Sequence, residues 1–366
     1  MDYSQILSQQ FNIKEEYAKN IITLLDDGNT IPFIARYRKE MHGSMDDQLI
    51  REFAEKLEYL RGLDKRRDEI RSLIDAQEKL TDEINLALDK AATLSELEDI
   101  YRPYRPKRKT RASIAKEKGL EPLANDILKQ EKGFDPSKSA VDYIDEEKGV
   151  TSVEDAIQGA MDIIAELVSD NAEIRKRIRN LTNANGVLVS VATDEEKDSV
   201  YKNYYDYKEP VKKIAGHRVL AVNRGEKEGF LKVSVETDSE KPLNSIFRAM
   251  ITDKNQLCSD IIREACTDAY QRLIYPSIER EVRNDLTDVA AENAMKVFAV
   301  NLKQLLMQPP VKGKTVLALD PGYRTGCKTA VVDSTGKVLD TTVIYPTHSD
   351  KKIQESKQTL LRLIKK

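Results

Sequence analysis

The segment LALDPGYRTGCKTAVVD, residues 317–333, decides the class of fold at the C-terminal end of this chain. It consists of a short apolar run that ends at Asp320, a glycine-containing turn and a second apolar run. A third run, VLDTTVIYP at residues 338–346, follows after another turn. The pattern predicts three successive strands of an antiparallel meander, and the apolar spacing of residues 353–366 predicts a helix after them.

Asp320 is an acidic residue at the C-terminal end of an apolar strand, as in the first strands of an RNase H-like nuclease fold. Such enzymes hold two divalent metal ions about 4 Å apart with clustered carboxylates. Asp320 is therefore the one candidate for a catalytic metal ligand; alternatively, it orders the turn after it. Of the nearby acids Asp333 and Asp340, the first begins a D-S-T-G turn, where its side chain caps its own backbone. One carboxylate cannot bind two metal ions, so we predict no catalytic residue and no cofactor. Only if the chain is a nuclease do we expect Mg²⁺ or Mn²⁺ as a cofactor.

Upstream of this meander, the spacing of apolar residues is mostly that of helices. It is clearest over residues 49–63, where Asp46 or Ser44 would cap the helix. GVLVSVA, residues 186–192, is the first predicted strand, and LKVSVE, residues 231–236, is another. The residues around Val219 to Val222 fit either a short helix or a strand.

A second strongly helical region runs from Asn255 to about Leu306, and we expect Pro276 to end one helix and start another. Pro309 and Pro310 mark a boundary after it. The predicted fold is mainly α and multidomain, with a helical region at 1–190, a mixed segment with long central helices at 191–310 and the first part of an α/β domain at 311–366.

The bulk composition excludes some classes of function. With 59 basic and 62 acidic residues the net charge is -3, so the whole molecule exerts no general attraction on polyanions. The three cysteines form no CxxC pair, which indicates reduced core residues and no zinc site. No run of 18 apolar residues occurs and the N-terminus lacks the features of a signal peptide, so we expect a cytoplasmic protein.

The strongest local charge lies in RPYRPKRKTRASIAKEK, residues 102–118, which holds eight basic residues and one acid. We expect Pro103 and Pro106 to keep its first part extended, with Tyr101 and Tyr104 interleaved among the cations. Guanidinium groups pair with phosphate, and tyrosine stacks on bases, so this ribbon is the predicted nucleic-acid-binding segment. Its candidate residues are Arg102, Tyr104, Arg105, Lys107, Arg108, Lys109 and Arg111.

Two other interpretations of this ribbon stay open at this point. Its cations could be internal struts that pair with acids on neighbouring helices, which a chain with 33% charged residues readily supplies. They could also form a surface for an acidic protein partner.

Four long blocks resemble the Tex family of transcription accessory proteins: residues 30–43, 97–124, 217–235 and 276–333. The resemblance implies a helical N-terminal region with a helix-turn-helix-like unit and then a YqgF-type, RNase H-like domain. In the family, helix-hairpin-helix elements and an S1 RNA-binding domain follow. We therefore expect the chain to stop within the YqgF-like domain and that domain to be incomplete.

The function that the resemblance implies is a non-enzymatic scaffold that binds RNA or DNA and contacts RNA polymerase or associated transcription factors. One alternative is a metal-dependent nuclease of the RNase H or resolvase type that uses Asp320. The other is an adaptor that binds only proteins.

Overall fold

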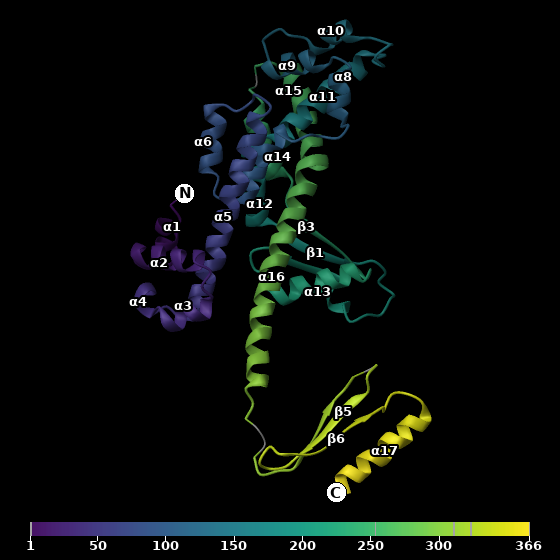
Figure 1. The fold of residues 1–366 in the computed structure, drawn as a ribbon. Coiled ribbons are helices and arrows are strands. Elements are labelled where there is room, and N and C mark those ends of the chain that lie inside the picture. Colours follow the sequence, from purple (N-terminus) through teal and green to yellow (C-terminus); the bar gives the residue numbers. More distant parts are fainter. Residues whose placement is uncertain (1, 253, 310–311, 323, 366) are drawn as a thin grey trace. The chain divides into compact units, whose positions relative to one another are not determined.

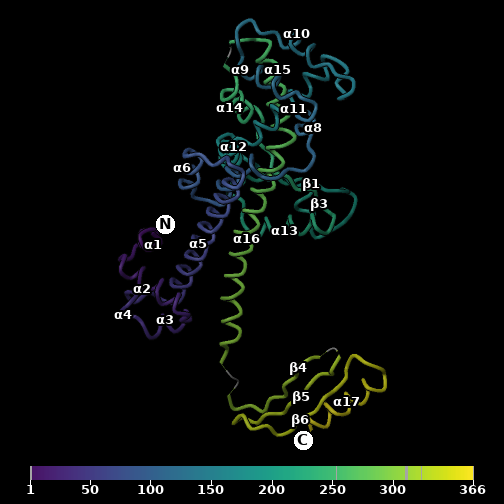
Figure 2. The backbone as a smooth tube through the Cα atoms, turned by 45° about the horizontal axis from the view of Figure 1, so that its top comes forward, coloured from purple at the N-terminus to yellow at the C-terminus, as the bar shows by residue number. Residues whose placement is uncertain are grey.

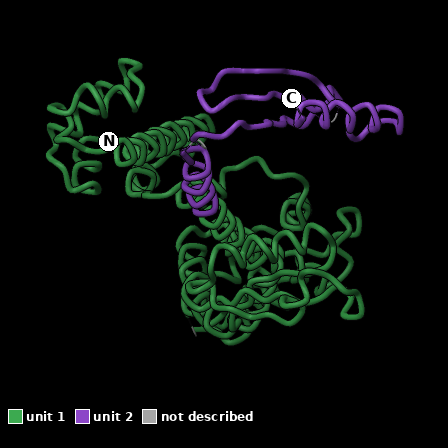
Figure 3. The backbone as a smooth tube through the Cα atoms, turned by 90° about the horizontal axis from the view of Figure 1, so that it is seen from below, with its two compact units in different colours: residues 1–292 green, residues 293–366 purple. Residues whose placement is uncertain are grey.

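The computed structural model describes residues 2–252, 254–309, 312–322 and 324–365, and it confirms the mainly α fold (Figure 1). The chain forms two compact units, residues 1–292 and 293–366, which Figure 3 colours separately. The predicted division at residues 190 and 310 stays a prediction; residue 190 lies within a strand.

The N-terminal helices are α1 (Tyr3–Phe11), α2 (Glu15–Asp26), α3 (Ile31–Tyr37), α4 (Lys39–His42) and the long α5 (Asp47–Asp75). Asp46 caps α5 by accepting a hydrogen bond from the Leu49 N–H at 2.8 Å, so Asp46, one of the two predicted caps, is the residue that acts. Apolar residues three and four apart along α5, such as Phe53 and Leu57, are buried against α1, α2 and α3.

The middle of the first unit is built around α11, on which α8, α9, α10, α12 and α15 pack. Its helices are α6 (Asp82–Lys90), α7 (Leu94–Tyr101), α8 (Arg111–Glu117), α9 (Glu121–Lys129), α10 (Pro136–Ala140), α11 (Val153–Asp170), α12 (Ala172–Asn185), α14 (Glu240–Met250) and α15 (Gln256–Asp268), with 3₁₀ turns η1 (Arg102–Tyr104) and η2 (Val141–Tyr143).

Figures 1 and 2 show α8, α9, α11 and α15 gathered together, and their buried side chains form the largest core. At Gly159 of α11 a Cβ atom would lie 2.3 Å from Leu120 Cδ1, so the buried Leu120 side chain would have to shift if any other residue stood at this position.

A small antiparallel sheet with the order β2-β1-β3 follows α12. Its strands are β1 (Val187–Ala192), β2 (Asp206–Pro210) and β3 (Leu231–Glu236), which confirms both predicted strands. The 3₁₀ turn η3 (Lys202–Tyr204) precedes β2. The ambiguous residues around Val219 lie in helix α13 (Gly216–Lys227), because Val219 and Val222 of one helical face are both buried.

Pro276 does not divide the second helical region into two helices, so that prediction is wrong. Helix α15 continues through a π-helical segment, η4 (Ala269–Ile274), directly into α16 (Tyr275–Leu306). A proline lacks an N–H and its ring crowds the carbonyl one turn earlier. The wider π turn just before Pro276 is where the chain takes up this misfit, and the helix goes on.

The second unit contains the predicted meander. Strands β4 (Val316–Asp320), β5 (Cys327–Val332) and β6 (Val338–Ile344) pair antiparallel in the order β4-β5-β6, and α17 (Asp350–Lys365) follows, as predicted. Pro310 of the predicted boundary and Tyr323 of the predicted turn lie outside the described residues.

The three cysteines are free and buried, as expected. Among the helices that the structure describes, none combines the length and the apolar character that a membrane span requires.

Candidate nucleic-acid interface

The predicted ribbon is a short surface loop that is fixed at both ends. It leaves α7 through the η1 turn, and the Tyr104 carbonyl accepts a hydrogen bond from Gln77 Nε2 at 2.9 Å. At the other end Thr110 and Ser113 form a capping box that begins α8. Thr110 Oγ1 also donates to Glu166 Oε1 of α11 at 3.0 Å. Only residues 105–109 therefore lie between these two anchored ends.

The first residues of the ribbon differ from the extended form that we expected. Arg102 to Tyr104 form a 3₁₀ turn, because the fixed φ of Pro103 suits the first positions of such a turn as well as an extended chain. Tyr101 is buried, with the Arg66 guanidinium over its ring, and Tyr104 is half-buried in the same apolar cluster. Tyr101 is thus a core residue, and the stacking role of Tyr104 stays a prediction.

Two of the seven candidates are held by acids of α11. Arg102 Nε lies 3.3 Å from Asp170 Oδ1, and Lys107 Nζ pairs with Asp170 and, at 3.4 Å, with Glu166. These two cations therefore pair internally with acids on a neighbouring helix, as the second interpretation of the ribbon proposed.

The other basic candidates have no such partners among the described residues. Arg105, Arg108 and Lys109 are exposed, and none makes an ion pair or a side-chain hydrogen bond with any residue that the structure describes. Arg111 is also exposed, and its charge acts on the half-buried Asp162 carboxyl from a distance. The ribbon thus keeps three exposed, unpaired cations at the centre of a segment with fixed ends.

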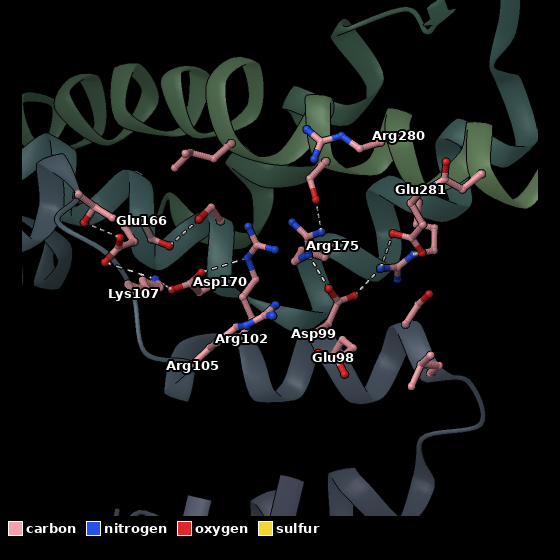
Figure 4. Close-up of a pocket in the computed structure, with 18 of the residues that line it drawn as sticks. Glu98, Asp99, Arg102, Arg105, Lys107, Glu166, Asp170, Arg175, Arg280 and Glu281 are labelled. Atoms are coloured by element: carbon pink, nitrogen blue, oxygen red, sulfur yellow. Dashed lines mark hydrogen bonds and ion pairs between the residues drawn. The ribbon is translucent and has the colours of Figure 1, made fainter. Parts of the chain in front are cut away.

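Behind the ribbon lies a cavity of about 650 Å³ between α7, η1, α11, α12 and α16 (Figure 4). Its floor is a network around Asp99, which accepts from Arg175 Nε and from Arg179 Nη2, each at 2.5 Å. Arg179 Nε also donates to Glu281 Oε1 at 2.6 Å, and Arg175 Nη2 donates to Ser277 Oγ at 3.0 Å. These bonds join α7, α12 and α16 through charged groups.

Burial and pairing act in opposite directions on these guanidinium groups. Burial opposes the charged form of Arg179, but its hydrogen bonds with Glu281 and Asp99 outweigh that effect and raise its pKa. For Arg102, burial and the nearby positive charge of Arg175 lower the pKa, and Asp170 and Asp99 offset only part of this. Arg102 therefore lacks the full compensation that Arg179 has.

The arginines of the cavity wall were missed by sequence reasoning. Arg175, Arg179 and Arg280 lie in ordinary charged helices, and only the packing of α12 and α16 brings them to the ribbon. The spacing of Arg175 and Arg179, one helical turn apart, is the only signal in the sequence, and it is common on solvated helices.

Asp320 ends β4 in the second unit and is exposed, and its side chain makes no hydrogen bond with a described residue. Asp333 accepts from the Thr335 and Lys337 N–H groups at 2.8 and 3.0 Å, as its turn-capping interpretation predicted. Within the described ranges no three metal-binding side chains gather at one place.

The sequence matches three family models in succession. They are the Tex-like protein N-terminal domain over residues 1–75, the Tex central region-like model over residues 131–298 and the Tex protein YqgF-like domain over residues 314–366. The ribbon at 102–111 lies between the first two matched stretches.

Curated relatives match along nearly the whole chain. The uncharacterized protein YdcI of Bacillus subtilis is 44% identical over 100% of this chain and 52% of the relative. The transcriptional accessory protein Tex of Neisseria gonorrhoeae is 38% identical over 100% of this chain and 48% of the relative. The human S1 RNA-binding domain-containing protein 1 is 32% identical over 94% of this chain and 36% of the relative. The chain spans about half the length of the bacterial relatives that it matches.

Proposed function

This chain belongs to the Tex family of transcription accessory proteins, and on that premise we propose that it is a non-enzymatic scaffold that binds RNA or DNA through the ribbon at residues 102–111. The observation that carries the proposal is the set of three exposed cations, Arg105, Arg108 and Lys109, which no carboxylate of the described residues neutralises. In a molecule with a net charge of -3, binding to a polyanion needs such a local cationic surface.

The fixed ends of the ribbon favour this role. A flexible cationic loop loses conformational entropy when it binds, whereas this loop is already held by the Tyr104 carbonyl and by Thr110. The printed names of two relatives, a transcriptional accessory protein and an S1 RNA-binding domain-containing protein, agree with nucleic acid as the ligand class. We further propose a cytoplasmic location and contact with RNA polymerase or its associated factors.

The nuclease alternative has less support. Asp320 stands alone among the described residues, with no second and third carboxylate beside it to hold a pair of metal ions.

The test is the salt dependence of binding to a labelled single strand. The combined substitution Arg105→Gln, Arg108→Gln and Lys109→Gln should weaken binding. It should also make the slope of log binding constant against log salt concentration shallower by roughly 2 units, because each phosphate contact contributes about 0.7 to 0.9 to that slope. Sequence preference should not change, because phosphate contacts carry no base information.

The matched control neutralises two arginines and one lysine elsewhere in the same unit, Arg51→Gln, Arg248→Gln and Lys241→Gln, which are exposed and unpaired within the described residues. An equal loss of slope in this control would contradict a specific role of the ribbon. Absence of any binding at low salt would favour the protein-binding adaptor, and cleavage of the strand when Mg²⁺ is added would favour the nuclease.

A further inference from the structure

Three arginines from different elements reach the cavity behind the ribbon. Arg102 comes from η1, Arg175 from α12 and Arg280 from α16, and all three line the same space. Figure 4 shows the guanidinium groups of Arg102 and Arg175 turned toward the interior of the cavity, with that of Arg280 across from them. The lowering of the pKa of Arg102 by Arg175 agrees with two cations that face each other at short range.

The carboxylates of the cavity are already engaged. Asp99 accepts from Arg175 and Arg179, and Glu281 accepts from Arg179. Asp170 and Glu166 pair with Lys107, and Glu98 pairs with Arg66 outside the cavity.

The remaining charges of the lining are mostly positive. Arg105, Arg108 and Arg280 have no ion pair with any described residue, and the one acid left is Asp285. Burial and the charges of Glu281 and Asp288 raise the pKa of Asp285. The cavity therefore has an excess of positive charge on the side of the ribbon.

Two guanidinium nitrogens in this cavity lack hydrogen-bond partners in the part of the chain that the structure describes. Arg175 is almost fully buried, with 3% of its side chain exposed, yet its Nη1 donates to nothing. Arg102 Nε, although near Asp170, also makes no hydrogen bond. Burying a charged donor without an acceptor is costly, and an oxyanion in the cavity would compensate the positive charge of both guanidinium groups.

We propose that this cavity binds a phosphate group through Arg102, Arg175 and Arg280. A tetrahedral oxyanion presents several acceptors, and planar guanidinium forks match its geometry. The volume of about 650 Å³ is in the range of small-ligand sites and leaves room for the nucleoside that carries the phosphate. The phosphate can belong to a strand held on the ribbon, in which case the inference rests on the proposed function, or it can be a free phosphate compound.

Arg280→Gln is the variant that tests the site, because Arg280 is exposed and takes no part in the Asp99 network, so its loss should leave the fold intact. Arg177→Gln is the matched control: Arg177 is exposed on α12, two residues from Arg175, but does not line the cavity. Circular dichroism and the melting temperature of both variants should equal those of the unmodified chain.

Inorganic pyrophosphate is the first probe, titrated by calorimetry at constant ionic strength. We expect binding by the unmodified chain and by Arg177→Gln, and roughly tenfold weaker binding by Arg280→Gln, a change of about 1.4 kcal/mol, because the variant loses a charged hydrogen-bond donor to the phosphate. No binding of pyrophosphate, or equal binding by all three proteins, would overturn the inference.

A short single strand with a 5′-phosphate or a 5′-hydroxyl is the second probe, and it identifies the source of the phosphate. A preference for the 5′-phosphate that Arg280→Gln abolishes assigns the site to a strand end, and a loss of affinity by the variant for both strands assigns it to an internal phosphate. If pyrophosphate binds in the expected order but neither strand binds, the inference holds for a free phosphate compound and the proposed function fails. If the strands bind with the ribbon-dependent salt slope and Arg280→Gln has no effect on either probe, the proposed function holds and this inference fails.

Discussion

Asp99 accepts hydrogen bonds from two arginines, so the three charged side chains compensate one another. The Asp99 carboxylate accepts from Arg175 and Arg179 and is itself buried. A buried ion network contributes little net stability when it is complete, but removal of one member leaves the other charges without compensation.

Asp99→Asn should therefore lower the free energy of unfolding of the first unit by about 3 to 5 kcal/mol, as loss of a partner in a buried pair does. Urea unfolding followed by circular dichroism measures this change. The control is Glu98→Gln, whose side chain is one-third exposed and pairs with Arg66 near the surface. Equal destabilisation by the two substitutions would show that the Asp99 network is not the special feature that we describe.

The residue scale also shows the limit of sequence reasoning about the site. Arg105, Arg108 and Lys109 could be picked out because they crowd into a segment that prolines exclude from long helices. Arg175 and Arg280 could not, because each lies among other charged residues of a helix, and the elements that it faces across the cavity are far away in sequence. The pairing of Lys107 with Asp170 was equally invisible, since 63 residues separate them.

At the scale of elements, the capping box of α8 fixes the C-terminal end of the ribbon. Thr110→Ala removes the cap and the hydrogen bond to Glu166, and we expect a loss of about 1 kcal/mol in stability together with weaker strand binding. The measurements are urea unfolding and the same binding titration.

Thr23→Ala is the comparison for this variant, because Thr23 is an exposed residue inside α2 where alanine favours the helix. A Thr110→Ala protein that is destabilised but binds strands with unchanged affinity would show that the anchoring of the ribbon is irrelevant to binding.

Most elements could be predicted because their periodicity is unambiguous. The strands β1 and β3 and the meander β4 to β6 followed from β-branched runs between turn residues. The uncertain residues around Val219 needed tertiary information, since a helix and a strand would bury different subsets of the same apolar residues. The prediction of a helix end at Pro276 was wrong because a proline usually interrupts a helix, whereas a π turn before this proline lets the long helix continue.

At the scale of the whole molecule, the two units differ in how much apolar surface they bury. The four apolar core clusters of the described chain all lie in the first unit, and the buried apolar side chains of the second are Cys327, Ile344 and Leu363. Stability rises with buried apolar area, so the second unit should open far more readily than the first.

Thiol labelling in native buffer measures this difference, because the cysteines are divided between the units. Cys327 should react first, whereas Cys258 and Cys266 should stay protected; burial also raises the pKa of Cys266 to about 12, which suppresses its thiolate. Simultaneous labelling of all three, with the reaction limited by a common unfolding event, would contradict independent stabilities.

The π turn before Pro276 also determines the rotational phase of everything that follows it. One additional residue in a helix rotates the downstream side chains by about 100° around its axis. Ser277 and Glu281 reach the arginines of α12, and Arg280 lines the cavity, only at the phase that η4 sets. Shortening that turn by one residue would carry the same amino acids to another side of α16, so the spacing of this segment is as much a part of the cavity as the residues that line it.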